Sequence, residues 1–394
     1  MSSGTPAAGM DPDLFAQFLA QLERYVRERL IPAEPEVIAT DRIPDDLMAE
    51  MVEMGLFGLT MPEEFGGAGM AVSQYIETIH ALSYAMPAFR SAISINVGMV
   101  CSALKNAGTA EQQARWLPRL AAGEVAAFGL TEPGSGSDSA GLQTTATRRG
   151  NGYVLNGTKR YITNAPHAKI GLIMARTHKD NLPRNAHVSA FIVPLDTPGV
   201  SRGKSDRKMG QAGSHIGDLI FDNVEVPGDA LLGGEEGRGF ATAMQSLDNG
   251  RLSVGAASTG YARRMLDTAT RYATERKAFG EPIANFQLVQ AMLADSYAEL
   301  YAAQCMMRDA IARADAGEKI LKQAAAFKLF ASEMCGRVAD RCVQIHGGAG
   351  YLAEYEAERF FRDARIYRIY EGTTQIMQLV IARQMLRDFA AGAA

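Results

Sequence analysis

Cysteine is scarce in this chain of 394 residues, and its four cysteines are scattered along the sequence. No CxxC pair occurs, so neither a disulfide framework nor a zinc site built on thiolates is indicated. We expect reduced thiols, most of them buried, at Cys101, Cys305, Cys335 and Cys342.

Histidine-based and phosphate-binding signatures are missing too. The six histidines form no HExxH or other paired spacing, and the chain has neither a GxxxxGK loop nor a GxGxxG fingerprint. These absences count against metal-dependent hydrolysis, P-loop chemistry and a Rossmann dinucleotide site. We therefore expect no bound metal.

The chain also lacks a strong charge of one sign and long apolar runs. Its formal net charge of -4 gives no general attraction to nucleic acid or to anionic membranes. The segment from Met1 to Asp13 has neither the basic nor the apolar region of a secretion signal, and no apolar run is long enough to cross a bilayer. We expect a cytoplasmic protein that binds neither nucleic acid nor membranes.

The texture of the sequence changes twice along the chain. Residues 1–121 have helical periodicity, with interruptions expected at Pro32, Pro44, Pro62 and Gly66-Gly67. Residues 122–234 contain short β-rich runs, among them 153–155, 170–174 and 190–193, and an Asn156-Gly157 pair that is typical of a hairpin turn. The order helix, β, helix predicts an α+β protein of several domains rather than a doubly wound α/β enzyme.

Residues 235–394 predict a bundle of helices. The glycines at 233, 234, 237 and 239 are followed by helical patterns over about 238–275, 283–315, 318–346 and 373–389. We expect these four main helices to form a C-terminal four-helix bundle.

The run from Tyr370 to Gln375 places one carboxylate on a loop directly before an amphipathic helix. Glu371 is a candidate catalytic base there, and Gly372 frees the backbone beside it. The alternative is a helix N-terminus at which an acid and two threonines satisfy free amides and the dipole. Spacing alone favours the capping role.

A second candidate site is the loop from Leu130 to Asp138, which gathers small residues, hydroxyls and backbone amides. Gly134 and Gly136 permit close approach of a flat polar ligand, although a plain surface turn has the same composition. Tyr161 and Thr163 should emerge at a strand end within reach of this loop. Tyr161 is either a stacking partner for a ring or a half-buried strand tyrosine.

Four separated motifs resemble the acyl-CoA dehydrogenase family in the same order. They are Leu130 to Asp138 with Gly141, Tyr161 to Asn164, Arg276 to Gly280 with Gln287, and Gln344 to Tyr351 leading to Tyr370-Glu371-Gly372-Thr373. The resemblance covers nearly the full length. It implies the fold of that family, with N-terminal helices, a β-barrel-like middle domain and a four-helix bundle, and a homotetramer that binds FAD between the β-domain and the bundle.

The resemblance also implies which residues bind FAD and which perform the reaction. Glu371 would abstract the α-proton of a short, medium or branched acyl-CoA thioester and the flavin would accept the β-hydride, giving the trans-2-enoyl-CoA. The electrons would pass to an electron-transfer flavoprotein. Positions that match flavin contacts are Phe128, Leu130, Thr131, Gly136, Ser137, Tyr161 and Thr163, with Thr373 and Gln375 at the last helix; those that match FAD contacts in a neighbouring subunit are Arg276, Phe279, Gln287, Gln344 and Gly348.

Substrate contacts follow in the same way. Ser137, Asp248, Arg251 and Gly372 match positions at the CoA portion or beside the base, although Arg251 could also be a cation on a helix surface. Some family members carry their base at the position of Gly250, which cannot act as an acid or base here.

The run Phe89-Arg90-Ser91-Ala92-Ile93-Ser94 resembles glutaryl-CoA dehydrogenases, in which the residues at Arg90 and Ser94 receive the distal carboxylate of the substrate. The alternative is an arginine that pairs with a structural acid or points to water. Two departures bear on flavin exposure and acyl specificity: Tyr161 replaces a frequent tryptophan, and Ala212 replaces a frequent arginine.

Two other functions belong to the same superfamily. Acyl-CoA oxidases share the fold and the base, but those of the long type carry a further C-terminal domain. A DNA-associated flavoprotein would need a basic surface or extension, which the composition does not show.

Overall fold

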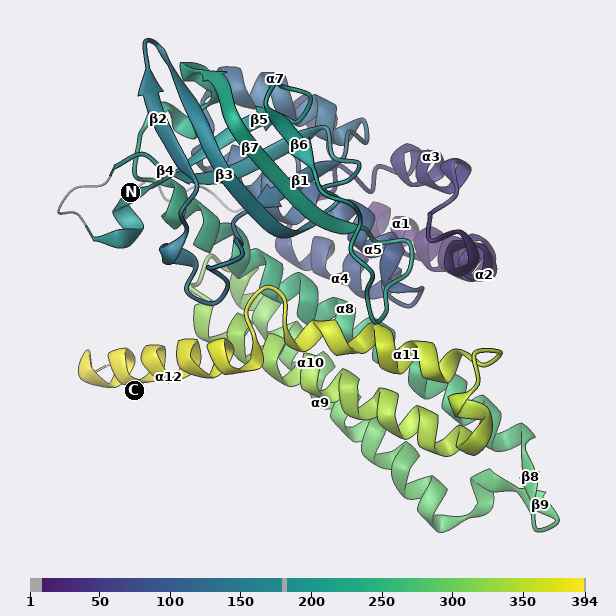
Figure 1. Cartoon of the computed structure of the whole chain (residues 1–394). Coiled ribbons are helices and arrows are strands. Elements are labelled where there is room, and N and C mark those ends of the chain that lie inside the picture. The colour runs from purple at the N-terminus through teal and green to yellow at the C-terminus, as the bar shows by residue number, and fades with distance from the viewer. Residues whose placement is uncertain (1–8, 179–182, 393–394) are drawn as a thin grey trace.

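The computed structural model describes residues 9–178 and 183–392 (Figure 1). The prediction about the first residues of the chain therefore falls partly outside the described part. None of the helices in these two ranges is long and apolar enough to cross a membrane.

Helices make up the N-terminal part of the molecule. Asp11 caps the first helix by accepting hydrogen bonds from the amides of Asp13 and Leu14, and Pro12 occupies the first turn. The helices are α1 Pro12–Tyr25, α2 Ile31–Thr40, α3 Asp45–Glu53, α4 Val72–Leu82, α5 Pro87–Ser94, α6 Cys101–Ala107 and α7 Ala110–Ala121, with the π-helical segments η1 Val26–Leu30 and η3 Ile95–Val100 and the 3-10 turn η2 Glu63–Phe65.

The interruption expected at Pro32 does not occur. The chain stays helical from Pro12 to Thr40, because the π-helical segment η1 shifts the backbone register just before the proline. Pro44 and Pro62 do precede the start of α3 and of η2, as predicted.

A seven-stranded curled sheet forms the middle of the chain. Its strands run in the order β1-β4-β2-β3-β7-β6, and β5 pairs with β4. They are β1 Ala126–Gly129, β2 Thr145–Arg149, β3 Gly152–Thr163, β4 Ile170–Arg176, β5 Val188–Pro194, β6 Val200–Arg202 and β7 Ile216–Pro227. All three predicted β-rich runs lie inside strands. On β7, Leu219, Phe221, Val224 and Val226 are buried between exposed neighbours, so the sheet presents one face to its own core.

The prediction of a hairpin turn at Asn156-Gly157 is wrong. Strand β3 continues through this pair, and the turn lies earlier, at Gly150 and Asn151. Gly157 marks an irregularity in the pairing of β3 with β7. A side chain at this glycine would lie 2.5 Å from Thr144 Oγ1, so close backbone approach rather than turn formation explains it.

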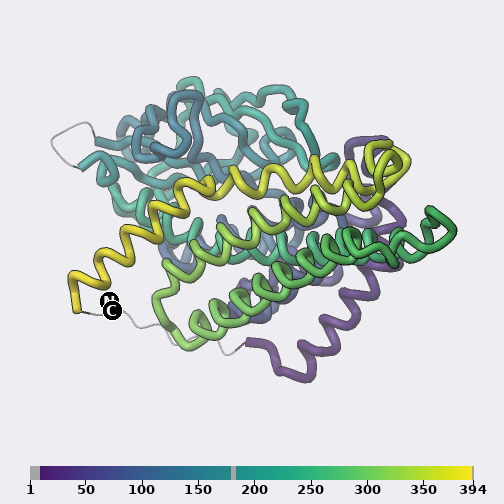
Figure 2. Tube along the Cα trace, turned by 90° about the horizontal axis from the view of Figure 1, so that it is seen from below, coloured from purple at the N-terminus to yellow at the C-terminus, as the bar shows by residue number. Residues whose placement is uncertain are grey.

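Helices resume after the sheet and lie side by side beneath it (Figures 1 and 2). They are α8 Gly239–Glu275, α9 Gln287–Asp315, α10 Leu321–His346, α11 Glu356–Ala364 and α12 Thr374–Ala390, with a short hairpin of β8 Lys277–Ala278 and β9 Glu281–Pro282 after α8. The four main helices agree with the predicted segments to within a few residues. Helix α11 was not predicted, because its nine residues are too few to show a sustained period and five of them are charged; its apolar side is formed by Ala357, Phe360 and Ala364.

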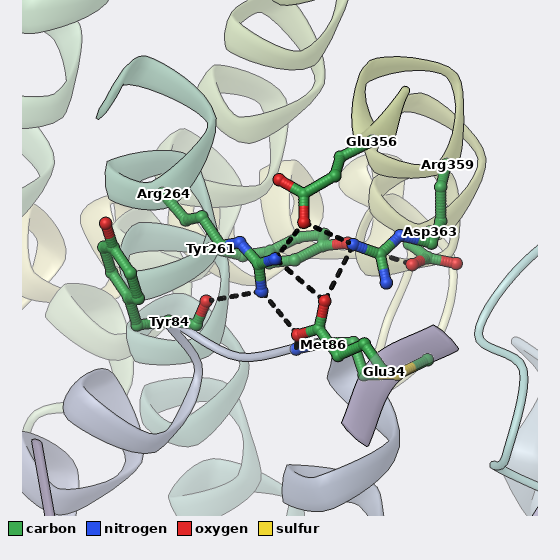
Figure 3. A network of polar contacts seen from close by, with 8 residues as sticks. All are labelled: Glu34, Tyr84, Met86, Tyr261, Arg264, Glu356, Arg359 and Asp363. Atoms are coloured by element: carbon green, nitrogen blue, oxygen red, sulfur yellow. Dashed lines mark hydrogen bonds and ion pairs between the residues drawn. The ribbon is translucent and has the colours of Figure 1, made fainter. Parts of the chain in front are cut away.

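A buried ionic network ties the N-terminal helices to the C-terminal ones (Figure 3). Glu34 of α2 lies between the guanidinium groups of Arg264 on α8 and Arg359 on α11, at 2.8 Å and 2.9 Å from its Oε2. Its Oε1 also accepts the backbone amide of Met86 at 2.8 Å, directly before α5. The network therefore fixes the start of α5, the helix that carries Arg90.

The predicted fold class is confirmed: N-terminal helices, a central curled sheet and C-terminal helices form an α+β protein of several domains.

Candidate active site

Glu371 and Gly372 form a turn between η10 (Arg365–Arg368) and α12. Both residues have positive φ, +53° and +98°, and a left-handed conformation at a glutamate is strained. Thr373 is the N-cap of α12, and its hydroxyl accepts the amide of Ile376 at 3.2 Å. The capping prediction is therefore confirmed for Thr373, whereas the side chain of Glu371 turns into the protein and keeps 12% of its surface exposed.

The carboxylate of Glu371 lies against α8 where that helix has a glycine. A Cβ at Gly250 would be 2.0 Å from Glu371 Oε2, so only glycine leaves the carboxylate in this position. Among the described residues, Oε2 is buried without a hydrogen-bond partner. Burial raises the pKa of Glu371 above its ordinary value, and the positive charges of Arg90, Lys328 and Arg251 oppose this shift.

Arg90 faces Glu371 from α5. Its Nη2 lies 4.0 Å from Glu371 Oε1 and donates a hydrogen bond to Ser253 Oγ at 2.8 Å. Tyr75 donates to the same hydroxyl at 3.3 Å. Arg90 is buried, and its Nε lacks a partner in the described part of the chain. The arginine therefore does not point to water, and the acid beside it is Glu371, the candidate base.

The other predicted substrate residues of this region are a charged pair on α8 and a serine on α5. Arg251 is buried and pairs with Asp248 one turn earlier on α8, so a cation on the helix surface is the wrong description of it. Its Nε is a further buried nitrogen without a partner among residues 9–178 and 183–392. Ser94 is buried too, but its hydroxyl donates to the carbonyl of Ser91 in its own helix.

The loop from Leu130 to Asp138 is held in shape from behind. Glu132 and Ser135 exchange two backbone hydrogen bonds of 3.0 Å and 3.1 Å, and the Ser135 hydroxyl donates to the carbonyl of Asp138. Lys159 of β3, fully buried, donates to Glu132 Oε1 at 2.7 Å. Burial lowers the pKa of Lys159 to about 8, and Glu132 opposes that shift.

This buried ion pair was not found from the sequence. A lysine in a strand and a glutamate in a turn are usually solvent-exposed, and nothing in their spacing connects them.

The outer surface of the same loop is open. Gly136 and Ser137 are exposed, and a Cβ at Gly134 or Gly136 would meet no atom within 4 Å. The amide of Arg160 donates to the carbonyl of Thr131 at 2.9 Å, which places the end of β3 beside the loop as predicted. Tyr161 is 59% exposed, so it is not a half-buried strand residue in this chain.

These features suit a flat polar ligand: open backbone, hydroxyls and an exposed aromatic ring lie together. Of the remaining residues predicted near the ring, Phe128 is half-buried, Leu130 is buried, and Thr163 ends β3. Thr373 and Gln375 lie at the start of α12.

The other predicted FAD contacts lie at the far end of the C-terminal helices. Tyr272 stacks on His346 with ring centres 4.1 Å apart, which joins the end of α8 to the end of α10. This end carries Arg276, Phe279, Gln287, Gln344 and Gly348. In Figure 1 it lies on the opposite side of the molecule from the sheet, near β8 and β9. One chain therefore does not bring the two predicted sets of cofactor residues together.

Comparison with known proteins matches all three parts of the chain. Family models described as the N-terminal, middle and C-terminal domains of acyl-CoA dehydrogenase match residues 15–124, 127–224 and 237–386. The human mitochondrial short-chain specific acyl-CoA dehydrogenase is 37% identical over 379 residues, which cover 96% of this chain and 91% of that protein.

Two further relatives are named for other reactions. The CarC subunit of the caffeyl-CoA reductase-Etf complex from Acetobacterium woodii is 38% identical over 374 residues, 94% of this chain and 98% of that protein. The solved complex of glutaryl-coenzyme A dehydrogenase with glutaryl-CoA has a TM-score of 0.90 at 30% identity, covering 98% of this chain and 96% of that one. With similarity over nearly its full length, the chain belongs to the acyl-CoA dehydrogenase family.

Proposed function

We propose that Glu371 is the catalytic base of an FAD-dependent acyl-CoA dehydrogenase and that the substrate is a short acyl-CoA. The observation that carries this proposal is the buried carboxylate of Glu371, whose Oε2 faces Gly250 without a hydrogen-bond partner among the described residues. A buried carboxylate oxygen that accepts no hydrogen bond from the described residues is available to receive a proton. Burial also raises its pKa toward the pH at which the enzyme works, which improves a general base.

Among residues 9–178 and 183–392, no other acid acts on the carboxylate of Glu371; the charges that act on it are those of Arg90, Lys328 and Arg251. The family position that can carry an alternative base is Gly250, and this glycine touches the same carboxylate. Glu371 therefore accepts the α-proton of the thioester. Its own backbone amide is the proposed donor to the thioester oxygen, on which negative charge develops as the proton leaves.

FAD is the cofactor of this family, and the open loop before β2 suits its flavin ring. When bound, FAD supplies the acceptor for the hydride of the β-carbon. Phe128, Leu130, Thr131, Gly136, Ser137, Tyr161 and Thr163 hold the ring in this proposal, and Thr373 and Gln375 add contacts at the N-terminus of α12, where free amides suit a phosphate. Ser137, Asp248, Arg251 and Gly372 contact the substrate.

Arg90 supports a short acyl chain. Its guanidinium lies 4.0 Å from the base, so only a few carbons separate the α-carbon from a buried positive charge. A distal carboxylate, as in glutaryl-CoA, would neutralise this charge and could be bound through two parallel hydrogen bonds. We propose more specifically that the substrate is a short dicarboxyl-CoA whose distal carboxylate is bound by Arg90 and Ser94.

The electron acceptor in this proposal is an electron-transfer flavoprotein, because the relative CarC belongs to a complex with Etf. We further propose a homotetramer, since the β8–β9 end of the helices, which carries one set of predicted FAD residues, lies on the opposite side of the molecule from the sheet (Figure 1). A neighbouring copy would bring Arg276, Phe279, Gln287, Gln344 and Gly348 to the cofactor.

The test is Glu371→Gln, which keeps the shape of the side chain and removes the base. We expect this variant to retain bound FAD and to lose bleaching of the flavin by butyryl-CoA almost completely. Glu354→Gln, at an exposed glutamate, is the matched control and should behave as the parent. Flavin reduction by Glu371→Gln at the rate of the parent would show that Glu371 has only a structural role.

A further inference from the structure

Lys328 is a buried cation that the reaction described so far does not use. It lies on α10 and has no exposed surface. Removing an ammonium group from water is costly unless its hydrogen bonds and charge are compensated. The cost of burying Lys328 must therefore be offset by specific contacts of its ammonium group.

The ammonium group contacts the turn that carries the candidate base. Lys328 Nζ donates a hydrogen bond of 2.6 Å to the carbonyl of Gly372. Glu371 and Gly372 both have positive φ, and such a turn persists only where its surroundings hold it. The hydrogen bond links the turn to the third turn of the long helix α10, which is a rigid support for a side chain that must be held in place.

The charges of Lys328 and Glu371 also attract each other, in addition to the hydrogen bond to Gly372. Burial lowers the pKa of Lys328 to about 8, the negative charge of Glu371 opposes the shift, and Arg251 adds to it. In return, Lys328 lowers the pKa of Glu371, as do Arg90 on α5 and Arg251 on α8.

Other titratable groups interact electrostatically with Lys328 or Glu371. Glu333 on α10 acts on Lys328, and the hydroxyls of Tyr75 and Tyr370 lie within the field of Glu371. Arg90 and Arg251 have other uses in the proposal, whereas Lys328 has none.

We propose that Lys328 is a positioning residue for the base: its ammonium group holds the Glu371–Gly372 turn in place and keeps the carboxylate of Glu371 in its charged, proton-accepting form. This inference rests on the proposed role of Glu371. It assigns to α10 a function in the reaction beyond packing.

The charge of Lys328 sets the direction in which the pKa of Glu371 changes when the lysine is replaced. Below about pH 8 Lys328 is charged and favours the ionised form of Glu371. Replacing Lys328 by a neutral residue raises the pKa of Glu371, so the base becomes protonated at a higher pH. The acidic limb of the rate profile then moves to higher pH.

The experiment is Lys328→Met, which replaces the lysine by an unbranched apolar side chain. Flavin reduction by saturating butyryl-CoA is measured as a function of pH. We expect the acidic limb of the variant to lie about one pH unit above that of the parent, because one nearby charge has been removed. Lys322→Met is the control: it removes the charge of a half-buried lysine of the same helix that pairs with Asp388, and it should leave the limb unchanged. An unshifted limb in Lys328→Met would overturn the proposal.

Thermal unfolding of four proteins gives a second readout that needs no turnover: the parent, Lys328→Met, Glu371→Gln and the double variant. Lys328→Met removes the hydrogen bond to Gly372 in both backgrounds, but only in the parent does it also remove a favourable charge pair with Glu371. We therefore expect the change in melting temperature caused by Lys328→Met to be less destabilising in the Glu371→Gln background than in the parent background. Equal changes in both backgrounds would contradict the coupling. If Glu371→Gln itself reduces flavin normally, the proposed function fails; if it is inactive and only the Lys328 results are negative, this inference alone fails.

Discussion

In the proposed function, Arg90 is the residue on which the choice of substrate depends most directly. The guanidinium of a free arginine on a helix would normally reach solvent, but here the helix α5 directs it inward, to within 4.0 Å of Glu371. The same cation can therefore act on the base and on the far end of a short substrate. Only a comparison of two substrates separates these effects.

We predict that Arg90→Gln lowers kcat/KM for glutaryl-CoA about tenfold to a hundredfold more than kcat/KM for butyryl-CoA. The basis is that a hydrogen bond to a charged group contributes about 1.5–3 kcal/mol. The ratio of the two constants cancels the change that loss of the cation causes at Glu371, since both substrates share the base. Steady-state kinetics with both thioesters give this ratio.

Arg90→Lys is the control, because it keeps the charge while changing the geometry. It should retain more glutaryl-CoA selectivity than Arg90→Gln. An equal loss for both substrates in Arg90→Gln, or no turnover of glutaryl-CoA by the parent, would rule out the carboxylate site.

At the scale of elements, α2, α8 and α11 are held together by charge as well as by apolar packing. Glu34 is buried between Arg264 and Arg359 (Figure 3). Removing one partner of a buried ion pair leaves the others uncompensated, which costs more than the pair itself contributes.

We therefore predict that Glu34→Gln lowers the free energy of unfolding by about 3–5 kcal/mol. Chemical denaturation followed by circular dichroism would measure the change. Glu36→Gln alters an exposed glutamate of the same helix and should change stability little. A Glu34→Gln protein as stable as the Glu36→Gln protein would mean that Glu356, which also contacts both arginines, is sufficient to compensate them.

The sequence predicted the regular elements well where hydrophobic periodicity determines them. Helix α8 was expected over 238–275 and runs from Gly239 to Glu275. The failures have local physical causes: a π-helical segment carries the chain past Pro32, and close backbone approach, not a turn, requires Gly157. Neither effect is visible in a pattern of apolar residues.

Buried charges were the main omission within the site. Lys328 and Glu34 would ordinarily be assigned to a helix surface. A signal for Lys328 was present, because it lies in the apolar stripe formed by Ala324, Ala331 and Cys335 on α10, all of which are buried. By contrast, the roles of Glu371 and Arg90 came from the family resemblance, and the structure adds the contacts that make them reasonable proposals.

For the whole molecule, the main consequence of the fold is that one chain holds two separated halves of the expected FAD site. The half beyond α8 ends in the β8–β9 hairpin, where Phe279 is 97% exposed. A large apolar side chain that is fully exposed at the tip of a hairpin suggests a contact surface for another copy.

We predict that Phe279→Asp prevents tetramer formation and lowers the FAD content of the purified protein. A buried carboxylate at the proposed contact would oppose both assembly and cofactor binding. Analytical ultracentrifugation and the ratio of flavin to protein absorbance test the two effects together. Leu14→Asp changes an exposed apolar residue of α1 and serves as the control. A Phe279→Asp protein that is tetrameric and fully loaded with FAD would contradict the shared site.

The contact between Gly250 and Glu371 limits how this family could exchange one base for the other. A side chain at residue 250 would occupy the space of the Glu371 carboxylate, with its Cβ 2.0 Å from Oε2. A substitution at 250 alone would displace the proposed base, and a substitution at 371 alone would remove it. In the proposed arrangement, moving the base from the turn to α8 therefore requires changes at both residue 250 and residue 371, because the two positions share one space.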